Sequence, residues 1–476
     1  MKRVIIICIL CWTCHFISAQ NDIIPILQSK NAEIMSEVLT KTNYDIYLKQ
    51  EFIPTIAIIP TDEALKSYID LVSYGQTVKK MWEFKLDGQS QLNAYVYDCD
   101  ENEDGTFTKQ GNSVMTLSGI GNGCISNRIK DLLDNSIIME PYSENKIFYK
   151  TRGNNFVQIE RKGNSYQVYG SLQRNVGHPI IVKESIQVGT CLLLLTDEPV
   201  MGTPNSVAKT LHDTEVDGEA IFEKFFDIVD ACAISPVNSK NGWRAADQTY
   251  GNLYNEKDAG MIGAEDSRTR KATYLLNNYH YTIYAPTNEA MDKAFAAGLP
   301  TLEDLEAAEL YDDENDLMGT AQSRADSIRE VMLDFVKYHI QDNAVFVNVE
   351  TAGVFNTAKT KLIKVISLDE TTDEETWNGD YTPGRPYKLS VQVKNGQMSV
   401  TDCNGTTTKV VIKEGAYNLM AREYWFTDED SRRQFVNPNT MRLNNSSFVV
   451  IHAIEDPLIF DAENQFTYTY KPLIQE

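Results

Sequence analysis

A ten-residue phrase occurs twice in this chain and limits the folds available to it more than any other feature. Residues 55–64 read TIAIIPTDEA, and residues 281–290 read YTIYAPTNEA. In each copy a β-branched or aromatic run favours a buried strand, which proline ends because it has no N–H for a neighbouring strand. Thr61 or Thr287 then caps a helix, and the acidic residues after it suit the helix dipole. Two copies of one strand–helix unit predict two related domains in tandem.

Size and charge set broad limits on function. The chain has 476 residues, of which 42% are hydrophobic, so it is long enough for two or three globular domains with sizeable cores. Its formal net charge is −23 at pH 7. A surface this acidic repels the phosphates of nucleic acids, and the sequence has no basic stripe interleaved with aromatic residues. We therefore exclude nucleic acid as a partner.

The N-terminus has the pattern of a secretory signal peptide over residues 1–19. Lys2 and Arg3 precede an apolar run over residues 4–12, and Ile-Ser-Ala at 17–19 suits cleavage before Gln20. The apolar run is too short to span a bilayer, and no later run reaches about 18 apolar residues. We therefore expect a secreted, periplasmic or cell-surface protein, held at a membrane only through a lipid anchor or a partner.

The cysteines do not indicate a disulfide framework. Cys8, Cys11 and Cys14 lie inside the predicted signal peptide, which is removed unless one of them carries a lipid. Five sparse cysteines remain, and this odd number leaves both disulfide pairing and free thiols open.

Hydrophobic periodicity predicts the domain boundaries. We predict a first domain over residues 22–200, a linker over 201–216, a second domain over 217–460 and a C-terminal tail over 461–476. Helical spacing occurs over 31–50, 219–231 and 323–339, whereas 155–169 and 387–413 have the alternation and turn pairs of β-hairpins. Residues 235–270 and 369–383 are polar, as surface inserts are. Thr301-Leu-Glu-Asp304 has the pattern of a helix capping box, and the glycine-rich run at 119–123 favours a turn with no helix after it.

Three motifs in the second half occur in a set order. The phrase YTIYAPTNEA comes first, a helical segment ending FVKYHI follows at 335–340, and SFVVIHAIEDPL lies at 447–458. In this order they resemble the fasciclin domain family over most of 217–460, with Met291 where the family usually has Phe. The resemblance implies an α+β fold, with each tandem domain a β-sandwich or wedge flanked by helices. It also implies an extracellular or envelope protein with a non-catalytic role in adhesion.

The first domain resembles a degenerate fasciclin domain. Its IPTDEA phrase is intact, but the apparent counterpart of Tyr338-His339-Ile340 is Phe84-Lys85-Leu86, which lacks histidine. Its last strand ends near Pro199 and also lacks histidine. Any family role of the Tyr-His pair is therefore expected in the second domain only.

Tyr338 and His339 are candidate partner-binding residues on the strength of the resemblance. The alternative interpretation places Tyr338 in the core and gives His339 a buried hydrogen bond that joins helix and sheet, together with His452 in its apolar strand. On that interpretation His339→Ala lowers the melting temperature by several degrees, for a loss of about 1–3 kcal/mol. An unchanged melting curve with lost binding would favour the partner-binding role.

Asp100, Asn102 and Asp104 match the start of a calcium-binding loop, in which oxygen ligands alternate and Gly105 permits a sharp turn. The twelfth position is Gly111, not the bidentate Glu that such a loop needs. Strand-like residues on both sides make an acidic hairpin turn the alternative interpretation. Calcium titration distinguishes the two.

Sequence motifs for catalysis are absent. There is no G-x-S-x-G elbow, no H-E-x-x-H and no phosphate-binding loop, so we expect no enzyme, no catalytic residue and no cofactor. Tyr424 and Trp425, beside an acidic segment, are candidates for stacking on a sugar. The expected partner is an extracellular or envelope protein or a polysaccharide. The alternative function is that of a glycan-binding accessory protein in bacterial nutrient capture.

Overall fold

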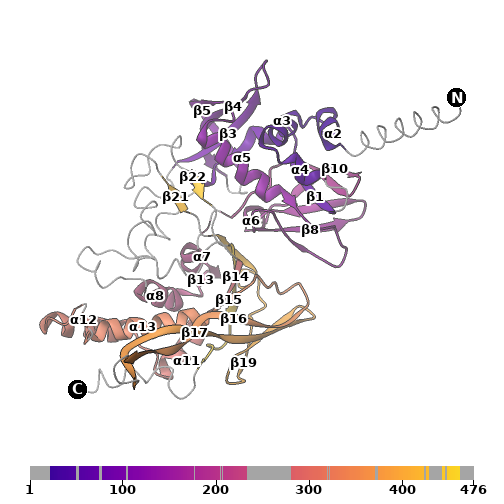
Figure 1. Cartoon of the computed structure of the whole chain (residues 1–476). Helices are drawn as coiled ribbons and strands as arrows, with labels where there is room; N and C mark the ends of the chain where they lie inside the picture. Colours follow the sequence, from indigo (N-terminus) through magenta and orange to yellow (C-terminus); the bar gives the residue numbers. More distant parts are fainter. Residues whose placement is uncertain are drawn as a thin grey trace, which may run out of the picture. The chain divides into compact units, whose positions relative to one another are not determined.

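The structure is a computed structural model that describes residues 22–49, 53–73, 78–102, 106–175, 177–203, 205, 207–232, 280–318, 320, 322–369, 374–422, 425–427, 442–444 and 448–460. The predicted signal peptide, the insert at 235–270 and the tail at 461–476 lie outside these residues. The chain divides into two compact units: one spans Met1–Pro204 with Tyr424–Asn445, and the other holds most of the chain from Asn205 onward (Figure 1). Both units mix helix and sheet, as the sequence predicts.

The first unit is built around a curled sheet of seven strands in the order β6-β1-β11-β10-β9-β8-β7. These strands are β1 (Thr55–Pro60), β6 (Ile137–Ile138), β7 (Phe148–Lys150), β8 (Phe156–Lys162), β9 (Ser165–Tyr169), β10 (Ile180–Val188) and β11 (Cys191–Thr196). A bridge joins Ile138, in edge strand β6, to Thr151, which directly follows edge strand β7. The sheet therefore curls until its ends meet, rather than forming two flat layers.

A second sheet and several helices complete the first unit. The second sheet is β2-β3-β4-β5, formed by β2 (Tyr68–Ile69), β3 (Lys79–Leu86), β4 (Leu92–Glu101) and β5 (Phe107–Ser118). The helices are α2 (Ile23–Ser29), α3 (Glu33–Thr42), α4 (Asp45–Leu48), α5 (Gly123–Ser136), α6 (Ser171–Asn175) and the short 3-10 turns η1 (Ala64–Ser67) and η2 (Leu71–Ser73). The two-stranded ladder of β21 (Trp425–Thr427) and β22 (Arg442–Asn444) also belongs to this unit.

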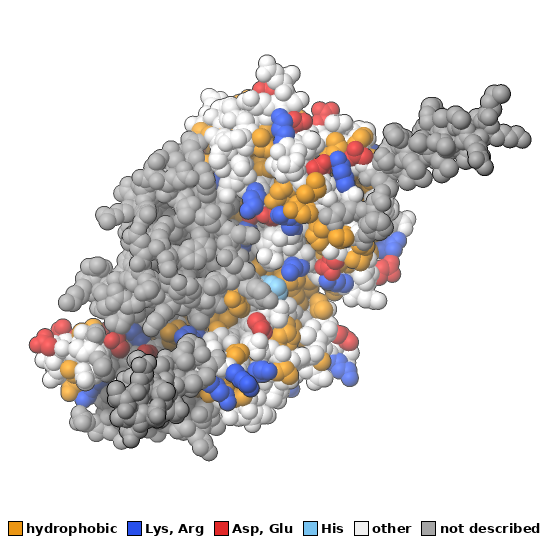
Figure 2. All heavy atoms as spheres, in the orientation of Figure 1, with side chains coloured by type: hydrophobic (Ala, Val, Ile, Leu, Met, Phe, Trp, Pro, Cys, Tyr) orange, Lys and Arg blue, Asp and Glu red, His pale blue; other side chains and the backbone are white. Residues whose placement is uncertain are grey.

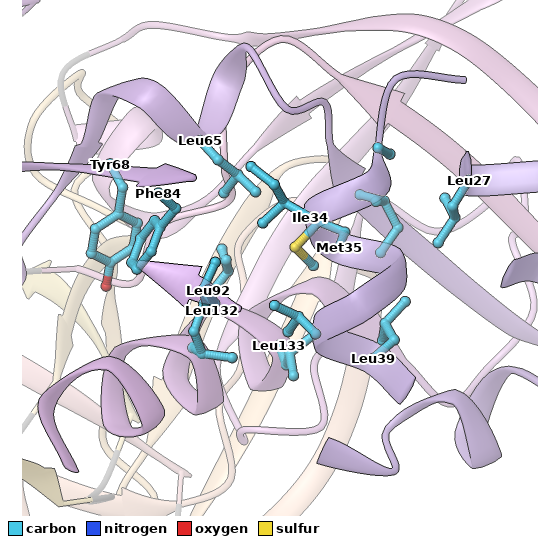
Figure 3. Packing of buried hydrophobic residues seen from close by; sticks show 14 of the residues in the cluster. Leu27, Ile34, Met35, Leu39, Leu65, Tyr68, Phe84, Leu92, Leu132 and Leu133 are labelled. Carbon is cyan, nitrogen blue, oxygen red and sulfur yellow. The ribbon is translucent and has the colours of Figure 1, made fainter. Parts of the chain in front are cut away.

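The core of the first unit lies between the helices and the two sheets. Figure 3 shows Leu27, Ile34, Met35 and Leu39 from α2 and α3 facing Leu132 and Leu133 of α5. Along β1 the side chains alternate between two clusters: Ala57 and Ile59 pack in this one, and Ile56 and Ile58 pack inside the curled sheet. Because β1 is buried on both faces, it reads as an uninterrupted apolar run.

The second unit has a curled sheet of eight strands in the order β19-β18-β17-β16-β15-β14-β23-β20. They are β14 (His280–Pro286), β15 (Ile340–Asp342), β16 (Thr351–Asp369), β17 (Glu374–Lys394), β18 (Gln397–Thr401), β19 (Thr407–Lys409), β20 (Leu419–Arg422) and β23 (Phe448–Ile454). A small ladder joins β12 (Glu215–Val216) to β13 (Glu219–Ala220). The helices are α7 (Val207–Asp213), α8 (Glu223–Cys232), α11 (Asn288–Ala296), α12 (Leu302–Glu314) and α13 (Arg324–Tyr338).

The two units repeat one arrangement around the strand that ends in Pro-Thr, here called the box strand. Box strand β1 pairs in parallel with β11 and antiparallel with β6, and box strand β14 pairs in parallel with β23 and antiparallel with β15. The N–H groups of Thr61 and Thr287 donate to the carbonyls of Thr196 and Ile454, the last residues of the parallel partners. The repeat read in the sequence is therefore a repeat of strand topology.

The residue that follows Thr61 or Thr287 caps a helix that lies earlier in its unit. Asp62 accepts hydrogen bonds from the N–H groups of Glu33 (3.1 Å) and Ile34 (2.9 Å) at the start of α3. Asn288 likewise accepts from the N–H of Lys224 at the start of α8, at 3.1 Å. We expected these residues to serve the helix after the box. They instead satisfy the free N–H groups of a helix earlier in the chain.

The first box threonine also differs from expectation. Thr287 caps α11 by accepting from the N–H of Ala290 at 3.2 Å, as predicted. Thr61 precedes only the 3-10 turn η1, and its buried hydroxyl has no hydrogen-bond partner. The second unit therefore has helix α11 after its box strand, whereas the first unit has only a short turn that leads into the sheet β2–β5.

Replacing Asp62 tests the cross-chain cap. Asp62→Ala should lower the free energy of unfolding by about 1–2 kcal/mol, because two N–H groups at the start of α3 lose their acceptor. Asp62→Asn should lose less than half of that, because Asn288 performs the same task in the second unit. Urea unfolding followed by circular dichroism measures both, and equal losses for the two variants would contradict the cap.

Several sequence predictions need correction. Residues 201–216 are not a plain linker: Val207, Leu211 and Val216 pack in the core of the second unit because α7 is amphipathic. The segment at 369–383 stays a predicted surface insert: β16 ends at Asp369, and β17 begins within the segment, at Glu374. A fourteen-residue helix, α5, follows the glycine-rich run at 119–123, where no helix was expected. Asn122 caps it by accepting from the N–H of Cys124 at 3.0 Å.

The proposed counterpart of the Tyr-His motif is also wrong. Phe84, Lys85 and Leu86 lie in β3, which belongs to the second sheet and not to the sheet of the box strand. Ile137 pairs with Ala57 and Ile340 pairs with Ile283, and these partners stand three residues before Pro60 and Pro286. Ser136, at the end of α5, therefore occupies the place of His339.

Other predicted elements are confirmed. Helix α13 covers most of 323–339, and Thr301 with Asp304 forms the capping box of α12. The hairpin of β8 and β9 turns at Gly163, and β17 and β18 turn at Asn395 and Gly396. None of the helices among the described residues is long and apolar enough to cross a membrane.

Candidate functional site

His339 lies in the core at the end of α13, fully shielded from solvent. Its Nδ1 is 2.8 Å from the carbonyl oxygen of Phe335, and its Nε2 accepts a hydrogen bond from the N–H of Leu458 at 3.0 Å. These partners assign the proton to Nδ1 in a neutral ring. Burial lowers the pKa of His339 to about 4, because the charged imidazolium would lose its hydration.

Tyr338 is equally buried and packs in a ring cluster with Tyr387 and Phe460, at centroid distances of 6.1 and 5.5 Å. Its hydroxyl accepts from the N–H of Cys403 at 2.9 Å. The structure therefore places Tyr338 and His339 in the core, with no exposed surface for a partner, as in the structural interpretation of the sequence.

His452 plays a related part on the neighbouring strand β23. Its Nε2 lies 2.9 Å from the carbonyl oxygen of Val345, and its Nδ1 accepts from the N–H of Asn418 at 3.2 Å. The ring stacks on Tyr284 of the box strand at 6.1 Å. His339 and His452 thus each bind two backbone segments, but with different partners.

The acidic calcium candidate lies at the tip of the β4–β5 hairpin, where Asn102 N–H donates to the Thr106 carbonyl at 2.8 Å. The amide of Asn102 donates to the hydroxyls of Thr106 and Thr108, and Asp100 accepts from Gln110. The structure therefore has the hairpin that the alternative interpretation predicted. Asp104 lies outside the described residues.

The remaining predicted residues are placed only in part. Tyr424 lies outside the described residues, and Trp425 is in β21, with its side chain not described. Among the described residues, no group of three or more His, Cys, Asp or Glu side chains is arranged to hold a metal ion. None of Cys99, Cys124, Cys191 and Cys403 forms a disulfide.

A cavity of about 240 Å³ in the first unit was not predicted from the sequence. Its walls come from the second sheet and from the segment around α6 and the end of β11. The apolar lining consists of Ile69, Met81, Phe107, Leu172, Pro199 and Met201, and the polar lining of Ser67, Thr106, Gln173, His178 and Glu198. Since these residues lie in five separate stretches of the chain, no motif or spacing could have revealed it.

The polar end of the cavity is a paired His178 and Glu198. His178 Nε2 lies 2.7 Å from Glu198 Oε1, and both side chains are partly exposed, at 41% and 37%. Ser67, also in the lining, donates its hydroxyl to the carbonyl of Ala64 at 3.2 Å. The pair therefore does not continue to a hydroxyl nucleophile, as a catalytic triad would require.

One wall of the cavity is fixed by hydrogen bonds. Gln173 donates its amide N–H to the carbonyl of Pro199 at 3.0 Å and accepts from the N–H of Met201 at 3.3 Å. Leu172 N–H donates to the Met201 carbonyl at 3.4 Å. Helix α6 is thereby joined to residues 199–201, so that this wall is formed without a ligand.

Gly170 permits this close approach. A Cβ at residue 170 would lie 2.5 Å from the Met201 carbonyl oxygen and 2.9 Å from its nitrogen. Gly170→Ala should therefore destabilise the protein by about 1–3 kcal/mol, because backbone must move. Thermal unfolding measures the loss. Gly163→Ala serves as the comparison, because Gly163 has open space around it and a φ of +63°, so its substitution strains only the backbone. A wild-type melting curve for Gly170→Ala would contradict the close approach of residues 170 and 201.

Comparisons with known proteins give a structural similarity but no sequence match. No model of a known protein family and no curated protein matches the sequence. A solved FAS1 domain pair from the insect cell adhesion molecule fasciclin I is similar to this chain at 11% sequence identity. The match covers 90% of this chain and 98% of that chain, with a TM-score of 0.24.

Proposed function

We propose that this chain is an exported, non-catalytic binding protein of the fasciclin type, with two tandem domains that recognise extracellular or envelope proteins or polysaccharides. The observation that carries the proposal is the repeated box strand. In both units it has one parallel partner late in the unit and one antiparallel partner that directly follows a helix. A duplicated unit of this kind suits a protein that presents surfaces rather than one catalytic cleft.

The second unit adds support from its motifs. Two of the three motifs that resemble the fasciclin family form the neighbouring strands β14 and β23. The third, at 335–340, forms the end of α13 and the first residue of β15, which pairs with the other side of β14. The two motif histidines, His339 and His452, each bind backbone from two segments. Their position explains why such a family would require them for folding and not for chemistry. The binding surface is therefore to be sought elsewhere than at Tyr338 and His339.

Charge limits the partners further. With a formal net charge of −23, the protein attracts basic surfaces and repels acidic ones. On the face shown in Figure 2, Lys and Arg side chains are scattered among acidic, polar and apolar ones. Association with a basic partner should therefore slow as salt rises.

A binding screen tests the proposal. Residues 20–476, immobilised for biolayer interferometry, are presented to extracellular and envelope proteins and to polysaccharides, with and without calcium. Saturable binding to a protein or polysaccharide supports the proposed function, and binding to one sugar class alone favours the glycan-capture alternative. If the protein melts cooperatively and yet binds none of these classes saturably, both the proposed function and the glycan-capture alternative are contradicted.

A further inference from the structure

The size of the cavity in the first unit sets the size of its occupant. An apolar cavity of about 150 Å³ holds benzene, and pockets for drug-sized ligands begin near about 300 Å³. At about 240 Å³, this cavity accommodates a substituted ring or a branched chain of similar bulk. A whole oligosaccharide or a folded segment does not fit within that volume.

The walls favour an apolar body. Met81 and Met201 supply polarisable thioethers, which contact aromatic rings favourably, and Phe107 supplies a ring. Ile69, Met81 and Phe107 form a small apolar cluster with Cys99 that is separate from the main core of the unit. Part of their apolar surface therefore faces the cavity, and an apolar ligand would remove that surface from water.

The mouth favours a positive charge. Glu198 supplies a carboxylate whose Oε1 is paired with His178, so Oε2 can still accept from a ligand. Neither Lys nor Arg is among the lining residues. The amide of Gln173 and the hydroxyl of Ser67 already bond protein groups. The Thr106 hydroxyl accepts from the Asn102 amide. Of the lining residues only Glu198 is an acidic residue, so its carboxylate is the strongest hydrogen-bond acceptor that the site offers a ligand.

These features disfavour other classes of small ligand. An anion would meet the Glu198 carboxylate within a chain of net charge −23, without a Lys or Arg in the lining to offset it. A sugar needs several convergent polar groups, which the lining does not offer once Gln173 and Ser67 are committed. A hydrophobic cation suits the site, because its apolar part contacts the apolar walls and its charge pairs with the Glu198 carboxylate.

We propose that this cavity binds a small hydrophobic amine, with the apolar body among Met81, Phe107 and Met201 and the ammonium group paired with Glu198. The site goes beyond the adhesion function proposed above and does not depend on it, since it lies wholly within the first unit. An amine end group of a larger molecule presents the same chemistry as a free amine.

Titration calorimetry of residues 20–476 with three matched probes tests the proposal. Phenethylamine should bind with a dissociation constant of about 0.1–1 mM, the range that ligand efficiency allows for so few atoms. Phenethyl alcohol should bind about tenfold more weakly, because it lacks the charge, and phenylacetate should not bind measurably. Equal binding of amine and alcohol would overturn the pairing with Glu198.

Two variants locate the site. Glu198→Gln should weaken amine binding about tenfold and leave alcohol binding unchanged, whereas Glu184→Gln, an exposed carboxylate paired with Lys30, should change neither. Ser67→Trp should block the cavity from its exposed rim, and Ser165→Trp, exposed outside the lining, should not. Melting curves confirm that each variant is folded. No binding of the amine, or unaltered binding to folded Ser67→Trp, would overturn the proposal.

Discussion

Asp70→Ala should destabilise the first unit by about 3–5 kcal/mol, because it leaves the guanidinium of Arg128 buried without its counter-ion. Arg128 and Asp70 are 0% and 1% exposed, and they meet in two hydrogen bonds of 3.1 Å each, from Nε to Oδ1 and from Nη2 to Oδ2. The guanidinium also lies 5.1 Å over the ring of Trp82. The pair ties α5 to the second sheet.

A double variant separates the cost of breaking the pair from its net value. Replacing both residues, as Asp70→Leu with Arg128→Met, should recover most of the loss, since buried pairs contribute little beyond well-packed apolar groups. Glu184→Ala, which breaks an exposed pair with Lys30, should cost under about 1 kcal/mol.

Urea unfolding measures these losses in the full chain, and hydrogen exchange of the α5 amides assigns them to the first unit. Equal losses for Asp70→Ala and Glu184→Ala would show that the buried pair does not stabilise the fold.

The second large effect is a loss of stability in acid that depends on His339. Its pKa is about 4 in the folded protein and 6.5 for the ordinary side chain, so the unfolded chain binds the proton more readily. The stabilisation linked to this group is therefore complete above about pH 6.5 and is lost as pH falls towards 4. Over that interval the loss approaches about 3 kcal/mol.

His339→Leu provides the comparison, because leucine does not titrate. At pH 7.5 the variant should be about 1–3 kcal/mol less stable than wild type, since Phe335 O and Leu458 N–H lose their partner. As pH falls from 6.5 to 4, this difference in stability should close. Only in the wild type does the unfolded chain carry a proton on residue 339, and folding must then release that proton or bury its charge. Between pH 7.5 and 8.5 the gap should stay constant. A gap that is independent of pH down to 4 would contradict a neutral buried His339.

Local patterns in the sequence were sufficient for much of the fold. The apolar runs ending in Pro60 and Pro286 predicted the box strands, and the spacing of Ile328, Met332 and Phe335 predicted α13. The capping box at Thr301 and the turn at Asn395-Gly396 depend on neighbours within a few residues. Such features carry their own signal because the contacts that form them are local.

Helix α5 shows where this reasoning stopped short. Ile125, Ile129, Leu132 and Leu133 have helical spacing and are all buried, but the glycine-rich run before them favours a turn, which conceals the start of the helix. Missing α5 misplaced the first unit's counterpart of the Tyr-His motif, which is set by register against β1 and not by resemblance of side chains.

The sequence by itself determined that the chain contains two related units, because a strand-forming run stopped by proline is a local property that recurs. Only the tertiary structure decided what the polar residues do. Asp62 and Asn288 cap helices 29 and 64 residues away, and Tyr338 and His339 are enclosed by segments from distant parts of the chain. The cavity at Glu198 exists because β2, β3, α6 and the end of β11 stop short of filling the space between them, and such a void depends on how separate elements pack.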